Sequence, residues 1–352
     1  MNKIFNDKDV FNAFGTTAEP KSKILEGLNP KQLEAVQAVD GPVVIRAGAG
    51  TGKTTVLTRR MAHIIELGKA RPTEILAVTF TRKAAGEMRH RLGTMLGDHV
   101  GRAVHVGNFH AVSSEMLRRH AERAGLSPRF TVLDEDGQRS VIGEIALKRG
   151  FITSKKDRVA IMEILSQISS WKEDGLDADA VDSAPDLGAI SAGPLADDHE
   201  FLARAAMVFR EYQEEIQAHR WCDFADLVLH MVRIFRAFPD ILEKEAGRFR
   251  YVMADEFQDT SPVQNEWLTL MAGKHRNICV VGDTDQSIYE WRNARPEIMT
   301  GFAKAWPGCK EVTIDINYRS SQEILDVANQ VVAPLRAKDR LDKLLRSPRT
   351  GI

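Results

Sequence analysis

The stretch VVIRAGAGTGKTTVL, residues 43–57, decides the fold. Its β-branched start favours a buried strand, the glycines favour a tight turn, and the residues after them favour a helix that begins near Lys53. A strand, a glycine-rich turn and a helix in this order direct backbone N–H groups and a helix N-terminus at phosphate oxygens. We therefore expect a nucleotide-binding loop made of Ala47, Gly48, Ala49, Gly50, Thr51, Gly52, Lys53, Thr54 and Thr55.

The last residues of this loop carry the chemistry. In the pattern G-x-x-x-x-G-K-[ST], the lysine reaches the β and γ phosphates and the following hydroxyl ligates Mg²⁺. Lys53 and Thr54 occupy those two places, and Ala47 stands where the strict pattern has glycine. The alternative, a structural glycine turn, does not account for the strand before the loop and the helix after it.

A second apolar run, YVMADE at residues 251–256, ends in two carboxylates. Asp255 is expected beside Mg²⁺, and Glu256 is expected to orient and deprotonate the attacking water. We expect this strand to neighbour the strand at residues 42–45 in one sheet. The sequence continues as DEFQ rather than D-x-x-G and has no N-K-x-D signal, which disfavours a GTPase.

Short apolar runs alternate with helical patterns, and this alternation predicts an α/β fold with a parallel sheet between helices. The predicted strands are residues 42–45, 75–80, 103–106, 251–254, 278–281 and 312–316. Residues 110–218 read almost entirely as helix, apart from a mobile surface loop expected at residues 174–199. The predicted units are a first sheet segment (1–112), an inserted helical subdomain (113–219), a second sheet segment (220–308) and the start of a second sheet domain (309–352).

Composition excludes several classes of protein. The chain has 352 residues, 43% of them apolar, which is enough to build real cores. It has no run of 18 apolar residues and no signal-peptide pattern, so we expect a soluble cytoplasmic protein without a membrane partner. The three cysteines and ten histidines lack disulfide-framework or metal-site spacings. The net charge of −1 does not by itself indicate nucleic acid, so any DNA site must be a local patch.

Further motifs follow in a fixed order and together resemble one family, the superfamily 1 helicases of the UvrD/Rep/PcrA group. They are LNPKQLEAV, AGAGTGKTT, VTFTRKAAGEM, VGNFHA, CDFADLV, MADEFQDTS, VVGDTDQSIYEWRNA and INYRSSQEIL, between Leu28 and Leu325. The resemblance implies RecA-like sheet domains, ATP and Mg²⁺ as cofactors, and single-stranded DNA and single-strand/duplex junctions as partners.

The resemblance also implies roles for single residues. Gln32 would read the adenine edge, Tyr318 would stack on the adenine, and Arg319 would reach the γ-phosphate from the second domain. Gln286 would sense that phosphate and link it to the DNA groove. The implied DNA contacts are stacking by Phe80, Tyr289 and Trp291 and backbone contacts by Arg82, Asn108, His110 and Arg292.

The chain departs from the family pattern at several positions. These departures affect the residues expected to contact the adenine and the DNA. Many relatives carry arginine at Thr55, asparagine at Arg82, threonine at Asn108, aspartate at Thr284 and glycine at Asn293.

The family's later motifs have no counterpart after Leu325, so we expect the N-terminal half of a motor. The predicted function is an ATP-dependent 3′-to-5′ DNA helicase in repair or replication restart. The alternatives are an ATP- and DNA-binding module without unwinding, and an unrelated phosphate-loop transporter or kinase. The absence of L-S-G-G-Q counts against the transporter.

Overall fold

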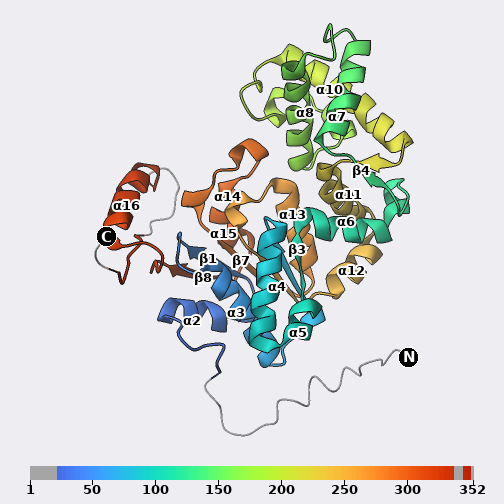
Figure 1. The fold of residues 1–352 in the computed structure, drawn as a ribbon. Coiled ribbons are helices and arrows are strands. Elements are labelled where there is room, and N and C mark those ends of the chain that lie inside the picture. The colour runs from blue at the N-terminus through green and yellow to red at the C-terminus, as the bar shows by residue number, and fades with distance from the viewer. Residues whose placement is uncertain (1–21, 337–343, 350–352) are drawn as a thin grey trace, which may run out of the picture.

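A six-stranded parallel sheet forms the centre of the molecule in the computed structural model, which describes residues 22–336 and 344–349 (Figure 1). The strand order is β3-β2-β6-β7-β1-β8. The strands are β1 (Val43–Ala47), β2 (Ile75–Thr79), β3 (His105–Asn108), β6 (Tyr251–Ala254), β7 (Ile278–Gly282) and β8 (Lys310–Ile314). The predicted α/β class, with helices on both sides of a parallel sheet, is confirmed.

Alternate strand residues build two cores, one on each face of the sheet. Val43 and Ile45 pack with α2 (Pro30–Gln37), α3 (Lys53–Glu66) and α4 (Arg82–Leu96). Val44 points to the other core, with α6 (Phe109–Arg119), α11 (Phe224–Ala237) and α13 (Pro262–Gly273). Because both faces are covered, the strands have continuous apolar runs rather than an alternating pattern. Smaller helices complete the layers: α5 (Asp98–Ala103), α12 (Pro239–Gly247), α14 (Pro296–Thr300) and α15 (Phe302–Ala305).

A separate helical lobe stands above the sheet in Figure 1. It contains α7 (Glu135–Lys148), α8 (Arg158–Glu173), α9 (Ala178–Asp182) and α10 (His199–Ala218), which share one apolar cluster. The apolar residues of α8 and α10 recur at the helical period and pack into the core of the lobe. Trp171, Phe209 and Tyr212 are fully buried there. Within residues 22–336 and 344–349, no helix is both long and apolar enough to cross a membrane.

The structure corrects the expected unit boundaries at two places. Val112, Met116 and Leu117 of α6 belong to the core of the sheet rather than to the lobe, so the insertion begins after α6. Strand β8 pairs in parallel with β1, so the first sheet extends past the expected boundary at residue 308. Two short strands were not predicted: β4 (Thr131–Val132) and β5 (Trp221–Cys222) pair where the chain enters and leaves the lobe.

The segment 174–199 is also more ordered than expected. It was predicted to be a mobile surface loop, but it contains α9, whose Ala178 and Val181 are buried in the core of the lobe. The Nε1 of Trp171 donates a hydrogen bond to Ser191 Oγ at 3.0 Å, which fixes a second point of the segment.

The chain beyond β8 forms α16 (Gln322–Arg336), and Ile316 forms an isolated parallel β-bridge with Arg346. That this part starts a second domain stays a prediction. The expectations for residues 1–21, 337–343 and 350–352 lie outside the described residues.

A buried carboxylate of α12 joins that helix to the end of α6. Glu245 is 1% exposed and accepts hydrogen bonds from Arg119 Nη2 and His120 Nε2, each at 2.9 Å. Burial alone would raise the pKa of Glu245, but these bonds, with Arg248, lower it to about 2. A carboxyl whose folded pKa lies below its unfolded value stabilises the protein above the unfolded value and loses that effect as pH falls.

We predict that Glu245→Gln destabilises the protein at pH 7 by about 2 kcal/mol, because positive groups are left without their buried partner. Urea unfolding of both proteins between pH 7 and pH 2 measures the difference. The difference in unfolding free energy between the two proteins should narrow below about pH 4.5. If this difference stays constant down to pH 2, the charge of Glu245 does not stabilise the folded protein.

Candidate functional site

The phosphate loop lies at the carboxyl edge of the sheet, between β1 and α3. Gly50 and Gly52 have φ values of +66° and +88°, a left-handed backbone that side chains disfavour. Thr51 Oγ1 donates a hydrogen bond to Gly48 O at 2.8 Å, which stabilises the turn. No side chain caps the N-terminus of α3, so its first N–H groups are available to an anion.

The acid pair after β6 meets this loop. Lys53 Nζ lies 2.8 Å from Glu256 Oε2, and Thr54 Oγ1 donates to Asp255 Oδ2 at 3.2 Å. The expectation that the two strands are neighbours is wrong, because β7 lies between β6 and β1. The long lysine side chain spans this strand, so residues 53–54 and 255–256 still converge.

The acids of this site carry an unfavourable concentration of negative charge. Burial raises the pKa of Asp255 to about 6, and the charge of Glu256 adds to the shift. The pKa of Asp259 is also raised to about 6, by burial and then by Glu256. A divalent cation would relieve this repulsion. Among the described residues no group of three or more His, Cys, Asp or Glu could hold a metal, so Mg²⁺ would need phosphate oxygens and water to complete its shell, as it usually does.

A line of hydrogen bonds leads from the acid pair to the loop after β7. Gln258 Nε2 donates to Glu256 Oε2 at 3.1 Å, and Asp283 N donates to Gln258 Oε1 at 2.9 Å. Gln286 Nε2 then donates to Asp283 Oδ2. Sequence reasoning chose Glu256 and Gln286 and missed the two residues between them. Their positions inside the motifs DEFQ and VVGDTDQ were the available signal.

The residues expected around the adenine lie on the other side of the loop. Gln32 is buried, and its Nε2 donates to Thr51 O at 2.9 Å. Asn29 Nδ2 donates to the Tyr318 hydroxyl at 2.9 Å, and Tyr318 N donates to Gly50 O at 3.0 Å. Thr55 accepts a hydrogen bond from Arg91 Nη1 at 3.0 Å.

Residues after β8 approach the loop closely, and at Gly50 this approach requires glycine. A Cβ on Gly50 would lie 2.8 Å from Arg319 Cβ, whereas one on Gly48 would meet only the end of the flexible Leu345 side chain. Asn317 Nδ2 donates to Ala49 O at 2.6 Å. The Arg319 side chain is exposed, and its role at a γ-phosphate stays a prediction.

A row of aromatic rings follows the same edge of the sheet. Phe80 stacks on Tyr289 with 4.6 Å between ring centroids, and Tyr289 lies 6.2 Å from Trp291. Trp291 is 71% exposed, and the Arg292 guanidinium lies 4.7 Å from its ring centroid. These residues come from the loops after β2 and β7, so separate motifs form one surface.

Three other expected DNA contacts lie at the start of α4, at the end of β3 and in the first turn of α6. Arg82 is exposed at the start of α4. Asn108 caps α6, its Oδ1 accepting from Ala111 N at 2.8 Å, so this oxygen already has a partner. Burial, with the charge of Arg292, lowers the pKa of His110 to about 4, so its ring is neutral at pH 7.

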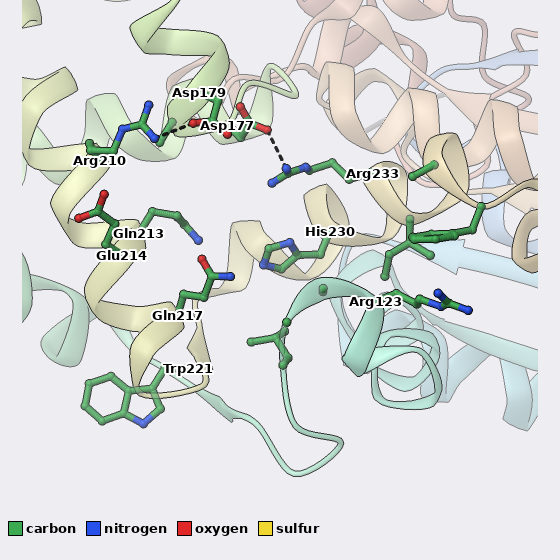
Figure 2. Close-up of a pocket in the computed structure, with 17 residues that line it drawn as sticks. Arg123, Asp177, Asp179, Arg210, Gln213, Glu214, Gln217, Trp221, His230 and Arg233 are labelled. Atoms are coloured by element: carbon green, nitrogen blue, oxygen red, sulfur yellow. Dashed lines mark hydrogen bonds and ion pairs between the residues drawn. The ribbon is translucent and has the colours of Figure 1, made fainter.

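One hollow of the described protein lies away from this edge. A cavity of about 540 Å³ lies between α9, α10 and α11, and Figure 2 shows Arg210 and Arg233 paired there with Asp179 and Asp177. None of the expected site residues lines it, so the candidate site is the open edge of the sheet and not this cavity.

Residues 28–307 match the model of the UvrD/REP helicase N-terminal domain. The chain belongs to this family. It is 38% identical over 309 residues to the ATP-dependent DNA helicase PcrA of Leuconostoc citreum, covering 88% of this chain and 39% of the relative. The PcrA proteins of Staphylococcus aureus strain Mu50 and of Staphylococcus epidermidis are 37% and 36% identical over 310 residues, each covering 88% of this chain and 40% of the relative. The chain thus spans about two fifths of the length of these relatives, and its RecA-like fold class is confirmed.

We predict that Asp255→Asn stabilises the nucleotide-free protein at pH 7.5 by about 1 to 3 kcal/mol, measured by thermal unfolding. The folded pKa of Asp255 is raised, so the wild type loses stability as pH rises from about 4 to 6. The amide removes the buried charge. Asp197→Asn, at an exposed aspartate, serves as the control. If Asp255→Asn is instead less stable at pH 7.5, the carboxylate is not under electrostatic strain.

Proposed function

We propose that this chain binds Mg-ATP at the carboxyl edge of its sheet and single-stranded DNA along the aromatic row, as the ATP-binding part of a 3′-to-5′ helicase. The contact between Lys53 and Glu256 across β7 supports this proposal most directly. It brings a phosphate-binding lysine and a candidate base to one place, which hydrolysis of a phosphoanhydride requires.

The chain's own residues would divide the work at the nucleotide. The N–H groups of residues 48–54 and the Lys53 ammonium would hold the β and γ phosphates. Thr54 and Asp255 would hold Mg²⁺, which supplies charge neutralisation on the phosphate oxygens when bound. Glu256 would accept a proton from the attacking water, and its release from Lys53 would accompany triphosphate binding. Gln32 and Tyr318 would contact the adenine, and Arg319 would add positive charge at the γ-phosphate.

The line Glu256, Gln258, Asp283 and Gln286 would link the nucleotide to the DNA. Gln286 lies in the loop that continues into Tyr289 and Trp291, so a shift of Gln286 toward a γ-phosphate would move the stacking surface. Bases stack on aromatic faces with little regard to sequence, which suits a protein that moves along DNA. We infer single-strand/duplex junctions as the substrate and repair or replication restart as the setting from the family alone.

A binding module without unwinding is the second candidate. Helicase stepping needs two domains that close on each other, and the described residues contain one large sheet. Phosphate release by the purified chain, with and without oligo-dT, separates the two. Stimulation by DNA supports the motor, whereas binding of ATP and DNA without stimulation supports the module.

We predict that Lys53→Ala reduces ATP affinity at least tenfold, because a buried cation that meets the phosphates is lost. Glu256→Gln should keep ATP affinity but abolish hydrolysis. Calorimetric titration and phosphate release measure the two effects, with the exposed Lys156→Ala and Glu163→Gln as matched controls. Unchanged ATP binding by Lys53→Ala would refute the phosphate-loop assignment.

We also predict different salt effects for two DNA contacts. Arg292→Gln should lower the slope of log affinity for oligo-dT against log salt by about 0.7, because one phosphate contact is lost. His110→Gln should weaken binding with the slope unchanged, because the imidazole is neutral at pH 7. Fluorescence anisotropy between 50 and 200 mM salt measures both. Equal slope changes would contradict the neutral state of His110.

A further inference from the structure

Asn293 stands where many relatives carry glycine, and the function proposed above gives this residue no role. Its backbone has φ +62° and ψ +21°, the left-handed conformation that favours glycine. Four described residues other than glycine have a positive φ, and Asn293 is the only one of these four that is buried. Asparagine thus adds a buried amide to a turn that glycine would fit, and a buried amide costs free energy unless its polar groups have partners.

Both polar groups of the Asn293 amide have partners. Nδ2 donates a hydrogen bond to Ser170 O at 3.2 Å, and Oδ1 accepts one from Arg295 Nη2 at 3.2 Å. These partners fix the orientation of the amide, because a carbonyl can only accept and a guanidinium can only donate. Ser170 lies in the last turn of α8. The amide therefore joins the loop after β7 (residues 283–295) to the helical lobe.

Arg295 makes a second contact between this loop and the lobe. Its Nη2 lies 3.4 Å from Oδ1 of Asp174, the residue that follows α8. Its backbone N–H donates to Thr260 O at 3.2 Å, in the segment after the acid pair. The ion pair is partly exposed, so it contributes little by itself. Because the same guanidinium also holds the Asn293 amide, the two contacts support each other.

A tight turn connects these contacts to the stacking rings. Asn293 N donates to Glu290 O at 2.9 Å, and Ala294 N donates to Tyr289 O at 3.2 Å. Trp291 lies inside this turn and is 71% exposed, so packing against the core does little to hold its ring. The position of the Trp291 ring therefore depends on how firmly the turn itself is held.

We propose that Asn293 is a positioning residue that holds the loop after β7 against the helical lobe, so that the lobe sets the position of the stacking rings. We call this contact the lobe latch: Asn293 and Arg295 on the loop, with Ser170 and Asp174 on the lobe. The proposal rests on the DNA-binding function proposed above. A glycine at residue 293 has no amide, so relatives with glycine there lack this hydrogen bond to the lobe.

The first test is Asn293→Gly, which suits the left-handed backbone and removes both hydrogen bonds of the amide. In the DNA-free protein, amide hydrogen exchange measured by mass spectrometry should become faster in residues 287–294 and stay unchanged in the sheet. Affinity for oligo-dT, measured by fluorescence anisotropy, should fall about fivefold, because binding must then order the loop. The salt slope should not change, since no phosphate contact is lost.

Arg220→Gly is the matched control for the backbone. Arg220 is an exposed residue of the lobe with φ +58°, so this variant also places glycine at a left-handed position. Thermal unfolding of both variants should show similar small changes, which establishes that each is folded. Hydrogen exchange in residues 287–294 of Arg220→Gly should match that of the wild type.

Asp174→Asn tests the lobe side of the latch, because charge and position predict opposite effects. By charge alone, loss of an acidic residue near the site would strengthen the binding of a polyanion. Loss of the contact with Arg295 should instead weaken oligo-dT binding about twofold, and by less when residue 293 is glycine. Asp197→Asn, at an exposed aspartate of the lobe, is the control that should not weaken binding.

The outcomes separate this proposal from the DNA-binding function. No binding of oligo-dT by the wild type defeats that function, while the exchange experiment still tests the latch because it uses no DNA. Unchanged exchange in residues 287–294 of Asn293→Gly overturns the latch. With a wild type that binds, an affinity of Asn293→Gly within twofold of it also overturns the positioning role. Stronger binding by Asp174→Asn overturns the contribution of the second contact.

Discussion

The ion pair between Lys53 and Glu256 is the contact around which the site is organised. It crosses β7 and joins the loops that follow β1 and β6, so the parallel order of the sheet decides which residues can meet. The turn can come this close to the residues after β8 because Gly50 has no side chain where Asn317 and Arg319 approach. In the nucleotide-free protein the lysine neutralises one acid, while Asp255 and Asp259 keep a raised pKa. The raised pKa values mean that a bound cation would relieve the repulsion between these acids.

The end of α8 fixes the helical lobe to the sheet domain close to this site. Ser170 O accepts from Asn293 Nδ2 at 3.2 Å, and Arg295 Nη2 donates to Asp174 Oδ1 at 3.4 Å. Glu173 accepts from the hydroxyl of Ser261, just after the acid pair, and burial raises the pKa of Glu173 to about 7. Residues at the end of α8 and just after it thus contact the loop after β7, the segment after the acid pair and, through Lys172, the start of α11. The lobe is placed by polar contacts that depend on the sheet domain being correctly formed.

Most of the sheet could be predicted, because fully buried parallel strands have apolar runs that stand out from the sequence. The glycine-rich turn and the acid pair could be located for the same reason, because each follows such a run. The unit boundaries could not, since they depend on partners distant in sequence. Strand β8 looks like the start of a new domain until its pairing with β1 is seen. Gln258 and Asp283 were missed because their importance comes from neighbours that only the fold supplies. The roles of the chosen site residues remain predictions, although the fold brings the nucleotide residues together at one edge.

A crystal structure of the chain with Mg²⁺ and a non-hydrolysable ATP analogue tests the central claim most directly. Electron density should place the β and γ phosphates against the N–H groups of residues 48–54, with the metal between Thr54 and Asp255. Lys53 should have moved from Glu256 to the phosphates. Nucleotide density elsewhere, for instance in the cavity between α10 and α11, with the ion pair between Lys53 and Glu256 intact, would contradict the account.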